Sequence, residues 1–329
     1  MKKNIQPLLL SISILFCISC FNKKQTEETP KPIVSNSNLR LAGAITTNGY
    51  YKNPGNNENS FFVRYYPNEA SPRPLIIAFH GGGFIGGDKS ACNLPLKFNM
   101  NSDAMITNLI TADQLDNQGY VYASANYILL AKGKNATVLN SLTDCKDFLN
   151  YMIANAATYN IDPNKIILIG NSGGAAASLW IGLQNNNIKG IVAINPQATL
   201  NILEWRNQVF APFGATSVFD YGFINNPNPQ ALADYASLLY GTTNQTAINN
   251  YCNTNHLSLF NLFDSSDPEL YMACGALASD PIHHSAHDWA LKQKSAAAGH
   301  SARILYTNAP QFWNTYQESV IQFCIRKFQ

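Results

Sequence analysis

Short apolar runs alternate along this chain with stretches whose apolar residues recur at helical spacing. The runs predict strands at 60–66, 74–79, 120–125, 165–169, 188–194, 270–275 and 302–306. The helical spacing predicts helices at 139–159, 172–183, 284–298 and 312–326. Buried strands that alternate with helices predict an α/β architecture with a mostly parallel sheet, covered by helices on both faces.

The alternation pauses between Pro196 and Asp267, where the chain is rich in Asn, Ala and aromatic residues and has no clear strand. The strand and helix pattern then resumes. We therefore expect a single domain at 38–329 with a helical insertion at about 200–263, rather than two domains.

The first twenty residues have the pattern of a targeting segment. Lys2 and Lys3 precede a short apolar run at 8–16, and Cys17-Ile18-Ser19-Cys20 follows. This pattern predicts a secretory signal at 1–20. Its end resembles a bacterial lipobox, which implies lipidation of Cys20; an ordinary cleaved signal peptide is the alternative. The polar residues at 21–37 predict a flexible tether. We expect an exported lipoprotein, anchored to a membrane by its lipid, in the periplasm or at the cell surface.

The composition narrows the class of partner. The chain of 329 residues is 46% hydrophobic and 13% charged, with a net charge of +2 and no long basic run. Nucleic-acid binding is therefore not expected. The body contains an odd number of cysteines, so at least one thiol stays free unless chains pair. Cys274 and Cys324 are predicted core residues, and a Cys92–Cys145 disulfide remains open.

The strongest chemical signal is Gly170-Asn171-Ser172-Gly173-Gly174, which lies between a predicted buried strand and a predicted helix. A nucleophile elbow needs this context, because its serine sits on a sharp turn where small residues relieve backbone crowding. The alternative is a glycine-rich turn that binds a phosphate at the helix N-terminus.

A second motif, His80-Gly81-Gly82-Gly83-Phe84, also follows a buried strand. Its glycines allow close backbone approach, and N–H groups that converge on one point stabilise the oxyanion of acyl transfer. In this order, the two motifs resemble those of the hormone-sensitive-lipase-like and related carboxylesterase families, over roughly residues 59–329. The resemblance implies an α/β-hydrolase fold in which the insertion is a lid.

The same resemblance implies roles for individual residues. Ser172 would be the nucleophile, and the N–H groups of Gly82, Gly83 and Gly173 would form the oxyanion hole. His80 would be structural. No metal or organic cofactor is expected, because serine chemistry requires none. Insertion aromatics are expected to pack the lid onto the sheet, and stacking on a sugar or an aromatic acyl group is the alternative.

The acid of the triad should follow the next-to-last strand, where Asp280 lies. Asp264 and Asp267 precede that strand and are predicted to form a solvated turn. The acid would orient the imidazole of the base and stabilise its charged form. Asp280 is therefore the predicted acid.

The base should follow the last strand, but Gln311 stands there, and an amide cannot take a proton from serine. His300 lies before that strand, toward the wrong edge of the sheet. His283, His284 and His287 follow Asp280, and we select His284 as the candidate base. Alternatively, these histidines only cap or solvate a helix.

Two functions are therefore in contention. The first is an esterase that hydrolyses small-molecule or glycan esters through Ser172. The second is a catalytically impaired pseudo-hydrolase that binds a ligand and lacks the base. A peptidase is disfavoured, because no pocket for an amino terminus or a proline is evident in the sequence.

Overall fold

The computed structural model describes residues 43–98, 109–131, 134–211, 229–274, 282–300, 302–306 and 318–329. The chain divides into two units, Met1–Asn36 and Ser37–Gln329. The first unit lies outside the described residues, and so do Cys20 and the predicted signal and tether. Within the described part of the chain, no helix is both long enough and apolar enough to cross a bilayer.

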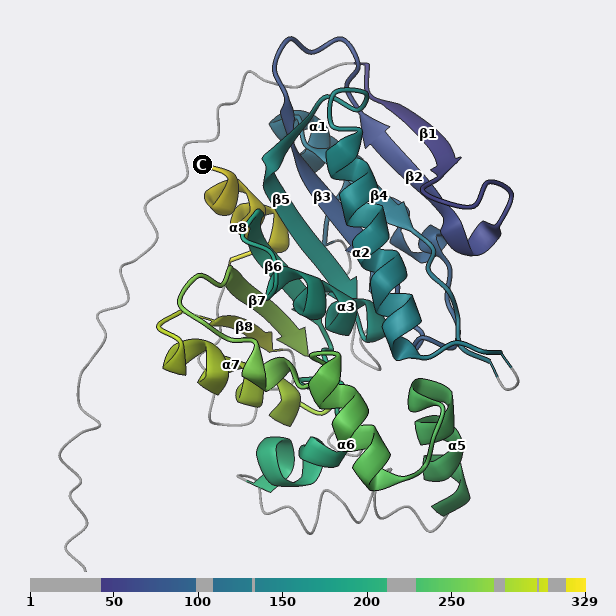
Figure 1. The fold of residues 1–329 in the computed structure, drawn as a ribbon. Coiled ribbons are helices and arrows are strands. Elements are labelled where there is room, and N and C mark those ends of the chain that lie inside the picture. Colours follow the sequence, from purple (N-terminus) through teal and green to yellow (C-terminus); the bar gives the residue numbers. More distant parts are fainter. Residues whose placement is uncertain are drawn as a thin grey trace, which may run out of the picture. The chain divides into compact units, whose positions relative to one another are not determined.

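The described residues form one sheet with the strand order β1-β2-β4-β3-β5-β6-β7-β8 (Figure 1). Pairing is antiparallel from β1 through β2 to β4 and parallel across the rest of the sheet. The strands are β1 Ile45–Tyr50, β2 Ser60–Tyr65, β3 Arg73–Phe79, β4 Val121–Ala125, β5 Ile161–Asn171, β6 Ile188–Ile194, β7 Glu269–Cys274 and β8 Ala302–Tyr306. The predicted α/β fold is confirmed; β1 was not predicted from the sequence.

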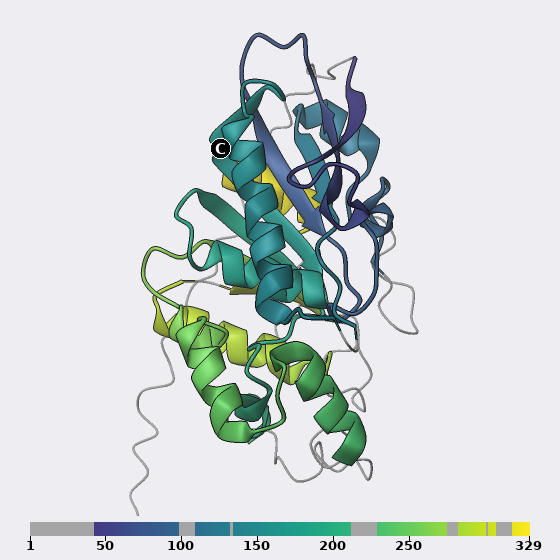
Figure 2. The same cartoon turned by 45° about the vertical axis from the view of Figure 1, so that its right-hand side comes forward.

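Helices cover both faces of the sheet (Figures 1 and 2). They are α1 Ala112–Gln118, α2 Val138–Ala154, α3 Gly173–Gly182, α5 Pro229–Tyr240, α6 Gln245–Thr254, α7 Ala286–Ala297 and α8 Val320–Phe328. Successive β3 side chains point to opposite faces, so Ile77 joins the core under α2 and α3, and Ile76 joins the core under α8. This two-sided burial explains the continuous apolar runs in the sequence.

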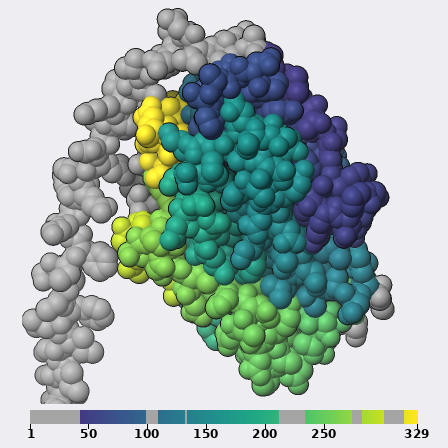
Figure 3. All heavy atoms as spheres, turned by 45° about the horizontal axis from the view of Figure 1, so that its top comes forward, coloured from purple at the N-terminus to yellow at the C-terminus, as the bar shows by residue number. Residues whose placement is uncertain are grey.

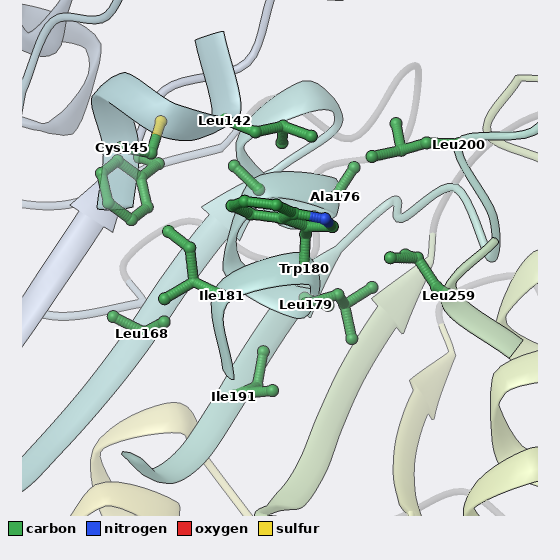
Figure 4. Close-up of a cluster of buried hydrophobic side chains, with 14 of the residues drawn as sticks. Leu142, Cys145, Leu168, Ala176, Leu179, Trp180, Ile181, Ile191, Leu200 and Leu259 are labelled. Atoms are coloured by element: carbon green, nitrogen blue, oxygen red, sulfur yellow. The ribbon is translucent and has the colours of Figure 1, made fainter. Parts of the chain in front are cut away.

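The segment between β6 and β7 forms the predicted helical insertion, which includes α5 and α6. Trp180 of α3 connects it to the sheet domain: the indole is 6% exposed and packs among Leu142, Leu200 and Leu259 (Figure 4). Its Nε1 donates to the Asn255 carbonyl at 3.3 Å. In the space-filling view, green atoms of the insertion lie directly against teal atoms of the sheet domain (Figure 3).

The cysteines whose side chains the structure describes are buried free thiols, namely Cys92, Cys145, Cys252 and Cys324. The open Cys92–Cys145 pairing is therefore excluded, because these two residues belong to the cores on opposite faces of the sheet. Cys324 is 0% exposed, as expected of a core residue. The side chain of Cys274 lies outside the described part.

Candidate active site

Ser172 occupies a strained turn between β5, which ends at Asn171, and α3, which begins at Gly173. Its φ of 51° and ψ of −118° are unusual for a residue with a side chain. A β-carbon on Gly174 would lie 2.2 Å from the Phe79 carbonyl oxygen. Glycine is therefore required where the turn crosses the neighbouring strand, and the turn has the backbone geometry of a nucleophile elbow.

The glycine motif after β3 packs directly against this turn. Gly82 has a φ of 113°, and a β-carbon there would lie 2.1 Å from the Gly86 carbonyl oxygen. A β-carbon built on Gly173 would lie 3.4 Å from the Gly83 nitrogen and 3.3 Å from the Phe84 nitrogen. The loop thus brings backbone nitrogens to the start of α3, beside Ser172. The Phe84 nitrogen was not predicted from the sequence as an oxyanion donor, because the sequence signal is the run of glycines before it.

Polar contacts with β4 and its C-terminal end hold this loop in place. Asn126 Nδ2 donates to Asp88 Oδ2 at 2.8 Å, and the Lys89 N–H donates to Asn126 Oδ1 at 2.6 Å. Burial raises the pKa of Asp88, but hydrogen bonds from Ser90 and Asn126 outweigh it and lower the pKa to about 2. Asp88 is therefore a carboxylate at neutral pH, with its loop tied to the sheet.

His80 packs at the start of the glycine loop, and among the described residues it makes no hydrogen bond to Ser172. Its ring stacks on Tyr127 with centroids 4.3 Å apart, and the Tyr127 hydroxyl donates to the His80 carbonyl at 2.8 Å. Burial lowers the pKa of His80, which favours the neutral ring. These contacts agree with the structural role expected of His80.

The histidine at Ser172 is His283. Its Nε2 lies 2.8 Å from Ser172 Oγ, which is hydrogen-bonding distance. With Nε2 unprotonated, the serine hydroxyl donates to it, which is the arrangement that a nucleophile and its general base require. His283 lies between β7 and α7, so the imidazole reaches the serine from the loop where an acid was predicted.

The sequence favoured His284, but the histidine in contact with Ser172 is its neighbour His283. His284 Nδ1 accepts from the Ala286 N–H at 3.0 Å, at the start of α7, and its ring lies against Phe210 at 5.5 Å. The third candidate, His287, is 0% exposed, and its Nδ1 accepts from the Ala198 N–H at 3.1 Å. Periodicity cannot separate adjacent histidines at a helix start, because the local turn decides which ring faces the serine.

Asp280 and Gln311 lie outside the described residues. Asp264 and Asp267 close a turn before β7, where the Asp264 N–H donates to Asp267 Oδ2 at 2.7 Å. His300 Nε2 lies 3.0 Å from the Asp264 carbonyl oxygen, so His300 belongs to the opposite edge of the sheet, as expected.

Ser172 opens into a small cavity of about 20 Å³. Most of its lining comes from the loop after β3, the segment after β6 and the insertion. The lining residues are Gly83, Phe84, Ser172, Gln197, Thr199, Leu200, Ile202, Trp205, Tyr235, Leu239 and Ile282. Tyr235 and Leu239 belong to α5, so the insertion forms part of the cavity wall. A larger cavity of about 450 Å³, lined in part by Asp234, Ser237 and Leu238 of α5, contains none of the candidate catalytic residues.

The aromatic residues of the insertion have two kinds of environment, the packed interior of the insertion and the wall of the Ser172 cavity. Trp205 is 2% exposed and donates through Nε1 to the Thr199 carbonyl at 3.0 Å, while Phe210 is 0% exposed against His287. Both therefore pack the insertion, as expected. Tyr235 lies at the cavity, where burial raises its pKa to about 12, so its hydroxyl is neutral.

The strand order, the elbow and the helical insertion together define an α/β-hydrolase fold. Comparison with known proteins then gives the family. The BD-FAE family model matches residues 64–276, and the chain belongs to this family.

Solved structures of esterases share the fold at low sequence identity. An inhibited esterase B from Lactobacillus rhamnosis has a TM-score of 0.55 at 14% identity, covering 80% of this chain and 75% of that one. A truncated carbohydrate esterase from gut microbiota has a TM-score of 0.54 at 16% identity, covering 82% of this chain and 88% of that one. A thermostable carboxylesterase from a metagenomic library has a TM-score of 0.53 at 16% identity, covering 85% of this chain and 82% of that one.

Proposed function

We propose that this protein hydrolyses carboxylic esters, with Ser172 as nucleophile and His283 as general base. The observation that carries this proposal is the 2.8 Å contact between Ser172 Oγ and His283 Nε2 at a strained strand-to-helix turn. The family match and the esterase neighbours support the same chemistry.

The reaction follows from this geometry. Ser172 Oγ attacks the ester carbonyl carbon while His283 Nε2 takes the hydroxyl proton. The N–H groups of Gly83 and Gly173, with Gly82 as predicted and Phe84 as an added candidate, stabilise the oxyanion. The imidazolium returns its proton to the leaving alcohol, which leaves an acyl-enzyme on Ser172. Water then attacks the acyl group while His283 takes its proton, and the imidazolium gives that proton back to Ser172 Oγ as the acid leaves. Asp280 remains the candidate that orients the imidazole.

The cavity favours a short acyl group. Its volume of about 20 Å³ slightly exceeds the roughly 10–15 Å³ that one water molecule needs, so a methyl group fits more readily than a longer chain. We infer that acetyl esters are preferred. A glycan ester is a suitable substrate class, since one similar structure is named a carbohydrate esterase and the export expected from the sequence would bring the enzyme to glycans outside the cytoplasm.

Hydrolysis of nitrophenyl acetate by the purified full-length protein tests the proposal. We expect turnover that falls about 10⁴-fold in Ser172→Ala and in His283→Asn, because each removes a reacting group. His284→Asn is the matched control: its amide oxygen keeps an acceptor for the Ala286 N–H, so turnover should persist. Wild-type turnover no faster than that of Ser172→Ala would support the ligand-binding alternative.

A further inference from the structure

The end of β6 and the segment that follows it make hydrogen bonds close to both candidate catalytic residues, Ser172 and His283. At its start, the Ile194 carbonyl accepts from the Ser172 N–H at 2.9 Å. The Asn195 N–H donates to the Ala273 carbonyl at 2.7 Å, which ties the ends of β6 and β7 together. The segment is therefore fixed relative to the serine turn before it reaches the histidine.

Two further hydrogen bonds flank His283. Gln197 Nε2 donates to the Ile282 carbonyl at 3.2 Å, immediately before His283. The next residue, Ala198, donates its N–H to His287 Nδ1 at 3.1 Å, one helical turn after His283. Gln197 is 7% exposed and His287 is 0% exposed, so little water competes for either bond.

His287 is itself held by aromatic packing. Its ring lies edge-on to Trp205, with centroids 4.9 Å apart, and to Phe210 at 5.5 Å. Accepting at Nδ1 requires that this nitrogen carry no proton, so the neutral ring carries its proton on Nε2. Trp205 also lines the Ser172 cavity, so the same contact connects the cavity wall to the segment that carries His283.

We propose that Gln197 and His287 are positioning residues that clamp the 282–287 segment onto the end of β6 and so hold His283 against Ser172. This inference rests on the proposed function. Its physical basis is that proton transfer needs a heavy-atom distance of about 2.6–3.2 Å, and a misplacement of about 1 Å can cost about 100-fold in rate.

The test pairs backbone exchange with kinetics. Gln197→Met removes the donor and nearly preserves side-chain length, and His287→Leu removes the acceptor. Each should accelerate hydrogen–deuterium exchange of the 282–287 peptide and lower kcat by about 10- to 100-fold. The fall should be equal for acetyl and butyryl esters, with KM little changed, because alignment rather than substrate fit is lost.

Two variants serve as controls. His287→Asn keeps an acceptor oxygen near the position of Nδ1 and should restore both slow exchange and kcat. Gln184→Met, at an exposed glutamine at the end of α3, should change neither. Thermal unfolding of each variant separates global destabilisation from local loosening.

Unchanged exchange in both Gln197→Met and His287→Leu would overturn the clamp, and so would faster exchange with unchanged kcat. A fall confined to butyryl esters, or seen only in KM, would assign Gln197 to substrate fit instead. Wild-type protein without esterase activity would count against the proposed function, whereas the exchange result would still decide whether the clamp exists.

Discussion

We expect Leu239 to limit the length of the acyl group that the Ser172 cavity accepts. It projects from α5 into the Ser172 cavity and is 3% exposed. Leu239→Ala removes the branched end of the side chain and extends a cavity that holds about one methyl group. A butyryl group has two more methylenes than an acetyl group, and each buried methylene contributes about 0.8 kcal/mol. The gain of about 1.6 kcal/mol corresponds to about 15-fold in kcat/KM.

The assay is the ratio of kcat/KM for nitrophenyl butyrate to that for nitrophenyl acetate. Leu238→Ala is the matched control, since Leu238 directly precedes Leu239 in α5 but lines the larger cavity. Leu239→Ala is expected to cost about 2–5 kcal/mol of stability, so both variants are compared well below their unfolding temperatures. An unchanged ratio in Leu239→Ala, or an equal rise in Leu238→Ala, would refute this assignment of the cavity.

Three further predictions concern separate parts of the chain. Asp88 has a folded-state pKa of about 2, below its ordinary 3.8, so its stabilisation is present above that ordinary value and is lost as pH falls through about 2. Urea unfolding should therefore show that the stability difference between wild type and Asp88→Asn shrinks over this range, and parallel curves would contradict it. Gln311→His should not raise esterase activity, because His283 already occupies hydrogen-bonding distance from Ser172; a large increase would instead support a site without a base. Cys20→Ala should abolish incorporation of labelled palmitate, and retained labelling would exclude lipidation at this residue.

Much of the fold is predictable from the sequence because it depends on patterns along the chain. Strands buried on both faces leave continuous apolar runs, and the predicted positions match β3 and β6 closely and fall inside the longer β5. β1 escaped prediction because an edge strand with mostly exposed side chains, such as Ile45 at 45%, lacks such a run. The elbow was predictable because its glycines lie directly between a buried apolar run and a helical pattern, although the crowding at Gly174 comes from Phe79 of the neighbouring strand.

Which histidine lies beside Ser172 was not predictable to the residue, because the position of the ring depends on tertiary contacts. His283 and His284 are adjacent, and the sequence favoured the second. In the structure, His284 caps α7, whereas the preceding residue faces Ser172. The bonds from Gln197 and Ala198 that flank this segment join residues more than eighty positions apart, and no local pattern predicts them.

The most direct test of the central claim is covalent labelling of Ser172 by a nitrophenyl phosphonate, followed by peptide mass spectrometry. A serine whose proton is taken by His283 should form the adduct in wild-type protein and in His284→Asn. It should react at least about 100-fold more slowly in His283→Asn, and Ser172→Ala should form none. Equal labelling rates in His283→Asn and wild type, or no adduct in wild type, would contradict the pairing of Ser172 with His283.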